Sequence, residues 1–171
     1  MACKYAHAEF VGLDQLLQKL DNVSGELVMS ASRKGLEKTM TKMRDDARKN
    51  CPEDTGELRS KIHYTTKVIA SHVRGELVSS AEHAIFVEMG TGPKGEAGVG
   101  SANVSPQIRK RVTYNARGWF TRNEKNGKPV ESRGMEPRPY LYPAYKTYER
   151  KVREDVRAEI YKAIREEGLG E

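Results

Sequence analysis

The sequence predicts an α+β fold in which two long helices pack on one face of a small antiparallel sheet, with a long basic loop inserted before the C-terminal helix. Three observations lead to this fold class. Apolar residues recur at helical spacing over residues 24–50 and 141–167, polarity alternates within residues 61–79, and glycines recur through residues 91–136. Helices and sheets that each have one apolar face bury those faces by stacking in two layers.

The first part of the chain is predicted to be largely helical. Residues 1–11 show no clear period, which leaves them free to extend along a neighbour. Leucines then follow the i, i+3, i+4, i+7 spacing of a short helix over residues 12–21. Ser24 is placed to cap a second helix. That helix is expected to end near Asn50, because Pro52 disfavours helical angles at the residue before it.

A helical turn and a hairpin are predicted next. Asp54 and Glu57 have the spacing of a capping box, which favours one helical turn over residues 55–60. Residues 61–68 alternate between polar and apolar, and residues 73–79 again have β-branched character. The two runs predict an antiparallel hairpin. Because the edges of so small a sheet are open, we expect them to be covered, and a neighbouring subunit is one way to do so.

Glu88 is the carboxylate that most needs a partner. It lies near the end of a short predicted helix, between Ser80, its expected cap, and Gly90, its expected stop. A negative charge is disfavoured at a helix C-terminus. Two interpretations stay open: Glu88 pairs with Arg59 or Arg138, or it is an ordinary exposed glutamate.

The positive charge of the chain belongs to residues 93–138, here called the basic arm. Ten basic and four acidic residues lie there, a balance of +6, and the 30 basic and 24 acidic residues of the whole chain also give +6. Such a segment is expected to face an anionic surface, either nucleic acid or an acidic protein. A turn signal at residues 123–128 predicts a hairpin tip. The candidate contacts are its basic and aromatic residues Arg109, Lys110, Arg111, Arg117, Trp119 and Phe120.

No motif in the sequence predicts catalysis, a metal site or a cofactor. The tripeptide Asp54-Thr55-Gly56 matches that of aspartic proteases, but no apolar strand leads into it, so a helix start is favoured. The histidines lack metal-ligand spacing, and there is no phosphate-binding loop or nucleophile elbow. Cys3 and Cys51 are expected to be free thiols in a reducing compartment. No membrane span and no signal peptide are expected.

Three short motifs stand in order along the chain. They are residues 52–62 (PEDTGELRSKI), 84–91 (AIFVEMGT) and 138–144 (RPYLYPA). In this combination the chain resembles the tail-completion, or neck, protein family of long-tailed bacteriophages, whose members are also described as head–tail joining or minor tail proteins. The motif residues are Asp54, Thr55, Gly56, Glu88, Gly90, Thr91, Arg138, Pro139, Leu141, Pro143 and Ala144.

The resemblance implies a structural virion protein of the phage neck that joins head and tail as an oligomeric ring around the DNA channel. It implies no catalysis, no metal and no cofactor. The expected partners are further copies of the chain, in a six-fold rather than a twelve-fold ring, the neighbouring head-closure and tail-terminator or tail-tube proteins, and packaged DNA. The expected location is the virion neck or tail, after assembly in the host cytoplasm and without a membrane.

The resemblance covers nearly the whole chain, and we expect a single domain. Its parts are a helix-hairpin-helix core over residues 12–92, the basic arm, and a C-terminal helix over residues 139–168. Two alternatives from other classes stay open. One is a free-standing, non-specific DNA-binding protein that uses residues 109–122, and the other, held formally, is a hydrolase built on Asp54.

Overall fold

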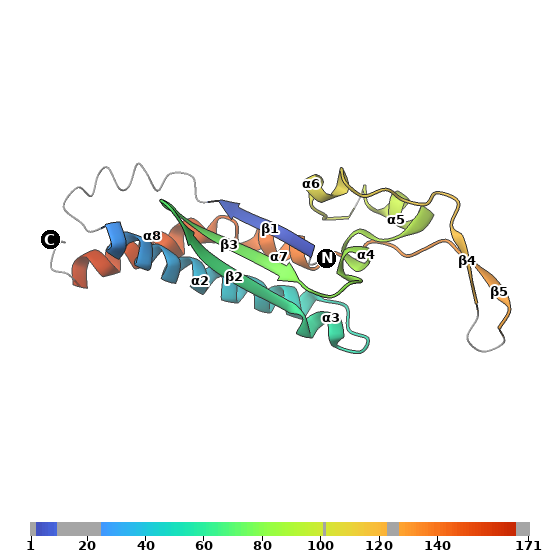
Figure 1. The fold of residues 1–171 in the computed structure, drawn as a ribbon, viewed down its shortest axis with the longest axis horizontal. Helices are drawn as coiled ribbons and strands as arrows, with labels where there is room; N and C mark the ends of the chain where they lie inside the picture. Colours follow the sequence, from blue (N-terminus) through green and yellow to red (C-terminus); the bar gives the residue numbers. More distant parts are fainter. Residues whose placement is uncertain (1–2, 10–24, 101, 123–126, 167–171) are drawn as a thin grey trace.

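A long helix and a hairpin precede the basic arm, and two helices follow it (Figure 1). The computed structural model describes residues 3–9, 25–100, 102–122 and 127–166. The helix predicted over residues 12–21 lies outside this range. In chain order the elements are β1 (Cys3–Glu9), α2 (Gly25–Asn50), α3 (Glu57–Ser60), β2 (Ile62–Ile69), β3 (His72–Ser79), α4 (Ala84–Met89), α5 (Gly92–Gly98), α6 (Pro106–Arg109), β4 (Trp119–Arg122), β5 (Pro129–Ser132), α7 (Leu141–Tyr148) and α8 (Lys151–Glu166).

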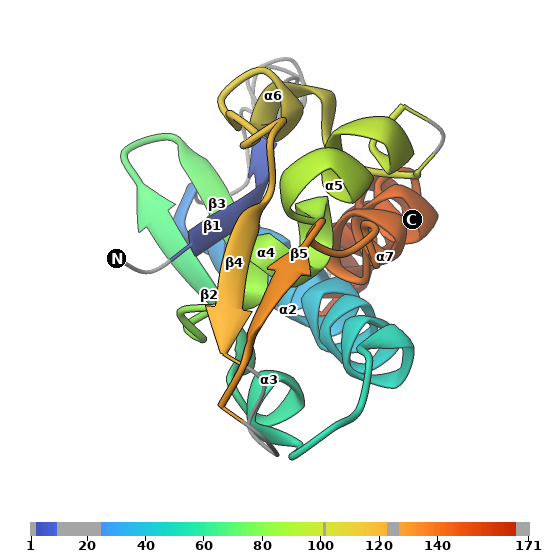
Figure 2. The ribbon, with the colours of Figure 1, turned by 90° about the vertical axis from the view of Figure 1, so that its right-hand side faces the viewer.

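The helices and the main sheet form two layers. β3 is the central strand of a three-stranded sheet with the order β1-β3-β2, and both neighbours run antiparallel to it. α2 packs along β2 and β3, and α7 and α8 pack beside α2 (Figures 1 and 2). The predicted α+β class, with long helices on one face of a small antiparallel sheet, is therefore confirmed.

The sequence does not predict β1. Residues 3–9 pair with β3 of the same chain, with a register shift between Lys4 and Ala6. A bulge of this kind interrupts the alternation of side chains along a strand, which explains why the segment shows no clear period. The pairing covers one edge of the predicted hairpin, and β2 forms the other edge of the sheet.

The main core lies between α2 and the sheet and continues between α2 and α8. Two glycines set how closely these layers approach. A Cβ at Gly75 would lie 3.1 Å from the Sδ of Met40, and a Cβ at Gly35 would lie 2.5 Å from the Cα of Val156. The buried apolar side chains include Val28, Leu36, Met40, Met43, Ile62, Leu77, Leu141, Val152, Val156 and Ile160.

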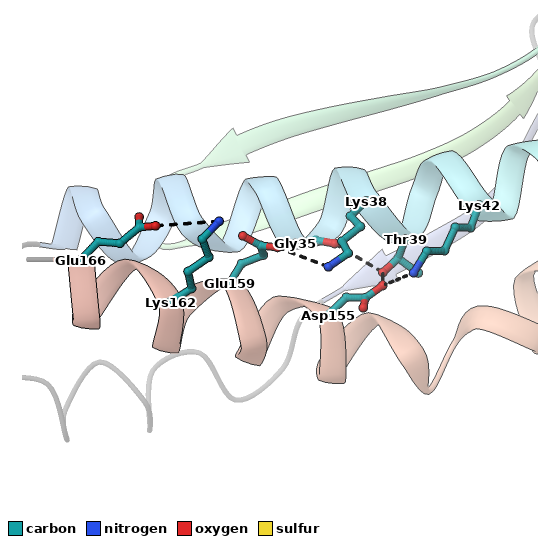
Figure 3. A network of polar contacts seen from close by, with 8 residues as sticks. All are labelled: Gly35, Lys38, Thr39, Lys42, Asp155, Glu159, Lys162 and Glu166. Carbon is teal, nitrogen blue, oxygen red and sulfur yellow. Dashed lines mark hydrogen bonds and ion pairs between the residues drawn. The ribbon is translucent and has the colours of Figure 1, made fainter. Parts of the chain in front are cut away.

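A row of polar contacts borders the packing of α2 on α8 (Figure 3). The Oγ1 of Thr39 donates to the carboxylate of Asp155 at 2.9 Å, and the Nζ of Lys42 lies 3.1 Å from the same carboxylate. Lys38 pairs with Glu159 at 3.4 Å. Partial burial pushes the pKa of Asp155 up, but the hydrogen bonds from Thr39 and Lys42 outweigh it, and the pKa lies below its ordinary value. The row shows which turns of α8 lie beside which turns of α2.

Two helices begin without their predicted caps. α3 follows Gly56, whose φ of +79° turns the chain into the helix with no side-chain cap, so the capping box predicted for Asp54 is wrong. The cap predicted at Ser80 is also wrong, because α4 begins further along the chain. The N–H of Ser80 instead donates to the carbonyl of Lys61 at 3.1 Å, which extends the pairing of the hairpin strands.

The C-terminal helix is split in two. The sequence predicts one helix over residues 141–167, whereas the structure has α7 and α8 with a break after Tyr148. Glu149 keeps helical angles (φ −49°, ψ −42°) and its N–H donates to the carbonyl of Tyr145 at 2.8 Å. The break therefore interrupts the regular helix without ending the apolar stripe. Residues beyond 166 lie outside the described part of the chain.

The basic arm has more regular structure than the sequence predicts. It contains α5, α6 and a β4–β5 hairpin, in which Trp119 pairs with Ser132 and Arg122 with Pro129. Residues 123–126 of the predicted hairpin tip lie outside the described residues. These elements have only four to seven residues each. A segment so short shows no clear period in the sequence, which is why a loop is predicted there.

Candidate assembly surface

Glu88 lies on the inner side of α4. Residues four apart share one face of a helix, and α4 accordingly buries both Ala84 and Glu88 while Phe86 stays 53% exposed. The side chain of Glu88 is fully buried, at 0% exposure. The interpretation of Glu88 as an ordinary exposed glutamate is therefore wrong.

The partners of Glu88 are three backbone N–H groups at the start of α7. Its Oε2 accepts hydrogen bonds from the N–H groups of Tyr140 at 2.8 Å and Leu141 at 3.1 Å, and its Oε1 accepts one from Tyr142 at 2.9 Å. The first N–H groups of a helix have no partner within the helix, and the helix dipole favours an anion there. Glu88 thus lies in the last turn of α4 and caps the start of α7.

Neither arginine that the sequence offers pairs with Glu88, so that prediction is wrong. Arg59 lies 3.5 Å from the carboxylate of Glu53, and the side chain of Arg138 is exposed. Arg138 contributes through its backbone instead, because its N–H donates to the carbonyl of Val87 at 2.8 Å. A helix N-terminus satisfies the buried carboxylate without the cost of burying a guanidinium as well.

Burial raises the pKa of the Glu88 carboxyl above its ordinary value, and the three N–H donors oppose this shift without cancelling it. Burial likewise raises the pKa of the Cys51 thiol to about 11, and the charge of Glu88 adds to that shift. Cys51 is a buried free thiol. A thiol with so high a pKa remains protonated near neutral pH and is a poor nucleophile.

The two ends of the basic arm are tied together at its base. The N–H of Thr91 donates to the carbonyl of Met135 at 2.9 Å, and the N–H of Met135 donates back to the carbonyl of Thr91 at 3.2 Å. The N–H of Lys94 also donates to the carbonyl of Arg133, at 3.1 Å. The arm therefore leaves α4 and returns to it as a closed loop.

Two glycines permit this close approach. Gly90 has a φ of +75°, and a Cβ there would lie 2.7 Å from the carbonyl oxygen of Met135. Gly134 has a φ of +78°, and a Cβ there would collide with the carbonyl of Thr91. Positive φ and the lack of space both exclude larger residues at these positions.

A second, smaller core fixes the first half of the basic arm on α4. Met89 packs with Val99 and Val104, which are all nearly fully buried. The hydroxyl of Tyr114 donates to the carbonyl of Met89 at 2.8 Å. Neither this core nor the main one includes a described residue of the β4–β5 hairpin. The hairpin projects from the end of the molecule opposite the described end of α8 (Figure 1).

Residues of all three motifs line a cavity of about 200 Å³, here called the motif cavity. The first motif contributes the Asp54–Gly56 turn and Leu58, the second Val87 and the third Arg138. Pro52, the first residue of the first motif, also lines it, and the lining residues outside the motifs are His83 and Met135. Motifs that lie far apart in the sequence are therefore brought together at one place between α3, α4 and the returning arm.

The rest of the third motif anchors α7. Leu141 and Ala144 are buried in the main core. Pro139 and Pro143 are half-buried in the approach and first turn of α7, where a missing N–H is tolerated. These residues position the helix start that Glu88 caps, and they do not form an exposed site.

The Asp54 turn lacks the arrangement of a protease. α2 leads into it rather than an apolar strand, and Asp54 is exposed. Within the described ranges, no residue forms a hydrogen bond or ion pair with its side chain. The paired, buried carboxylates of aspartic proteases differ from this arrangement.

The candidate contact residues of the basic arm fall into two groups. Residues 109–111 are exposed at the end of α6, whereas Arg117, Trp119 and Phe120 lie at the start of the hairpin. Figures 1 and 2 place α6 and the hairpin apart, so the two groups do not form one continuous surface. A Cβ at Gly92 would lie 2.9 Å from the Trp119 ring, so Trp119 packs at the base of the hairpin.

The described ranges contain no group of three or more histidine, cysteine, aspartate or glutamate side chains placed to hold a metal ion. No helix within them has the length and apolar character needed to cross a membrane.

Part of the chain matches a known family. Residues 14–90 match the family model described as "Bacteriophage HK97-gp10, putative tail-component". The matched range contains α2, α3, the β2–β3 hairpin and α4, and with them the first two motifs almost in full. The basic arm, α7 and α8 lie beyond it. No curated protein and no solved structure matches the chain.

Proposed function

We propose that this protein, whose residues 14–90 match the HK97-gp10-like family model of phage tail components, joins head and tail as a ring of copies around the DNA channel. The family match supports a structural role in the tail and a place in the virion. The proposed neighbours are head-closure and tail-terminator or tail-tube proteins, and a six-fold ring would match the symmetry of the tail.

The observation that carries the proposal is the Glu88 junction, by which we mean Glu88 and the three backbone N–H groups of residues 140–142 from which it accepts hydrogen bonds. The matched segment ends at this junction, and the rest of the chain is bonded to it there through Glu88 and Thr91. The segment that matches the family thus carries an arm. The base of the arm is held by backbone hydrogen bonds, and its hairpin projects. Projecting elements that are firmly held at their base are suited to contacts with neighbouring subunits, since little ordering entropy is lost on binding.

The test is deletion of the gene from the phage genome, followed by electron microscopy of the lysate. We expect filled heads and separate tails, with intact particles restored when the wild-type gene is supplied in trans. Normal titres of intact particles from the deletion phage would overturn the proposed role. Loss of heads alone, or of tails alone, would contradict it equally, since a joining protein acts after both are built.

A DNA-binding role is the second candidate, and the exposure of residues 109–111 favours it. Arg109, Lys110 and Arg111 form no ion pair with any described residue. The role predicts retardation of duplex DNA at low salt that falls steeply as salt rises. Replacement of the three cations by glutamate should abolish it, whereas Arg153→Glu on the exposed side of α8 should change it little. Absence of retardation by the wild-type protein at low salt excludes this role.

A further inference from the structure

We propose that the β4–β5 hairpin of one copy docks into the motif cavity of the next copy, with Phe120 inside the cavity and Arg122 beside Asp54 at its rim. The inference rests on the proposed ring and names the contact that builds it. Its occupant is a second copy of this chain, and three features of the described residues support it.

The first feature is the exposed face of the hairpin. Phe120 is 76% exposed, more than any other large hydrophobic side chain of the described residues. Alternate residues of a strand share a face, so Arg122 lies on the same face as Phe120, and both strands pair in register from Trp119 to Arg122. Burial of one phenylalanine side chain is worth about 1.5–3 kcal/mol. An aromatic residue with a neighbouring arginine is also the composition typical of interface hot spots.

The second feature is the size and lining of the motif cavity. Pro52, Leu58, Val87 and Met135 give it apolar walls. One water occupies about 30 Å³ in the liquid, so a cavity of about 200 Å³ has room for several waters or one aromatic side chain. Figure 1 shows the hairpin separated from α3, so a chain does not fill its own cavity in this way.

The third feature is charge. Glu53 pairs with Arg59 at 3.5 Å and Glu57 with Lys61 at 2.5 Å, whereas the carboxylate of Asp54 has no partner among the described residues. The cation of Arg122 is likewise without a partner in the described part of the chain. The hairpin therefore offers an unpaired cation and the cavity an unpaired carboxylate.

The same face argues against nucleic acid as the occupant. Glu131 stands directly opposite Phe120 in the hairpin and lies 3.7 Å from the Nε of Arg133. The hairpin thus carries charges of both signs around an apolar side chain, which suits a protein surface better than a row of phosphates. The hairpin and the motif cavity are different surfaces of one chain, so a contact between the hairpin of one copy and the cavity of the next is heterologous. Heterologous contacts close into rings when the rotation per copy divides a full turn, so the docking is compatible with the proposed ring.

The test is a charge exchange, read by native mass spectrometry of purified protein over a range of concentrations. Arg122→Asp, Asp54→Arg and Phe120→Ser should each lower the association constant at least tenfold. The double variant Arg122→Asp with Asp54→Arg should recover most of the loss. Arg153→Asp makes the same charge change on the exposed side of α8 and should assemble like wild type. Circular dichroism melting checks that every variant is folded.

The outcomes separate the two proposals. Wild-type protein that stays monomeric at every concentration overturns both the ring and the docking. A ring that forms equally well from wild type, Arg122→Asp and Phe120→Ser leaves the ring standing and overturns the docking. A double variant whose association constant is no higher than that of either single variant would also overturn the docking. Loss of DNA retardation in Arg122→Asp, with assembly unchanged, would assign the hairpin to nucleic acid instead.

Discussion

At the scale of single residues, Glu88 joins the end of α4 to the start of α7. Its two oxygens accept three N–H groups from residues 140–142. A buried donor left without a partner costs about 1–3 kcal/mol. Glu88→Ala should therefore lower the free energy of unfolding by about 3 kcal/mol or more in urea titrations, while Glu88→Gln, which keeps one acceptor oxygen, should lose less. Glu82→Ala, at an exposed position, is the control, and equal stability of Glu88→Ala and wild type would contradict the capping role.

The raised pKa of Glu88 also predicts a pH dependence of known sign. Burial makes the folded protein hold this proton more tightly than the unfolded chain, whose ordinary value is 4.5. The stability that protonation contributes is therefore complete below pH 4.5 and is lost as pH rises through the folded pKa. Asp155 has a lowered pKa and acts in the opposite direction, but it contributes equally to wild type and Glu88→Gln. As pH rises, wild type should therefore lose unfolding free energy relative to Glu88→Gln. A difference between the two proteins that stays constant with pH would contradict the raised pKa of Glu88.

The sequence identifies Glu88 as needing a partner but not which partner. The positive charges at Arg59 and Arg138 are visible in the sequence, whereas the partial charge of a helix N-terminus is not. One signal does exist: Pro139 and Pro143 mark the start of a helix, and a helix start has unpaired N–H groups. The start of α7 faces Glu88 because α7 packs against the core. No local sequence pattern predicts that packing.

At the scale of elements, the crossing of α2 and α8 depends on Gly35. Alanine is favoured over glycine inside a helix by about 1 kcal/mol, but a Cβ here would lie 2.5 Å from the Cα of Val156. Overpacking against a backbone costs about 1–3 kcal/mol, so Gly35→Ala should lower the melting temperature. Gly25→Ala, at the start of the same helix with nothing within 4 Å, should not. A melting temperature of Gly35→Ala equal to or above that of wild type would show that the two helices separate easily.

The long elements are predictable from this sequence, and the short helices α3 and α4 are predicted near their observed places. The strand β1 and the helix α6 are not predicted, and of the β4–β5 hairpin only the turn is predicted. α2 and the β2–β3 hairpin have enough residues for periods of 3.6 and 2 to be recognised. β1 contains a register shift, and α6, β4 and β5 have four residues each. β1 pairs with β3, which is distant in the sequence, whereas β4 and β5 pair with each other. The existence of β1 is therefore a property of the tertiary structure rather than of local preference.

At the scale of the whole molecule, three motifs recognisable in the sequence converge on one cavity and one buried carboxylate. Their order along the chain is enough for the resemblance to a phage family, and residues 14–90 match such a family. The sequence does not predict that the three motifs come together in the fold. They do so because the arm returns to α4 through the hydrogen bonds between Thr91 and Met135. The glycines at positions 90 and 134 are the sequence signature of that return, since only glycine fits there.

The same organisation predicts three levels of hydrogen exchange. The slowest amides should lie in α2, β3 and α8, which form the main core. Those of α5 and α6 should be intermediate, because a small core around Met89 holds them. The β4–β5 hairpin belongs to neither core, and its amides should exchange fastest in dilute protein. At concentrations where copies assemble, docking of the hairpin should slow its exchange selectively, while α6 stays unchanged. Uniform protection of residues 93–136 in dilute protein would contradict this order and would place the hairpin within the folded core.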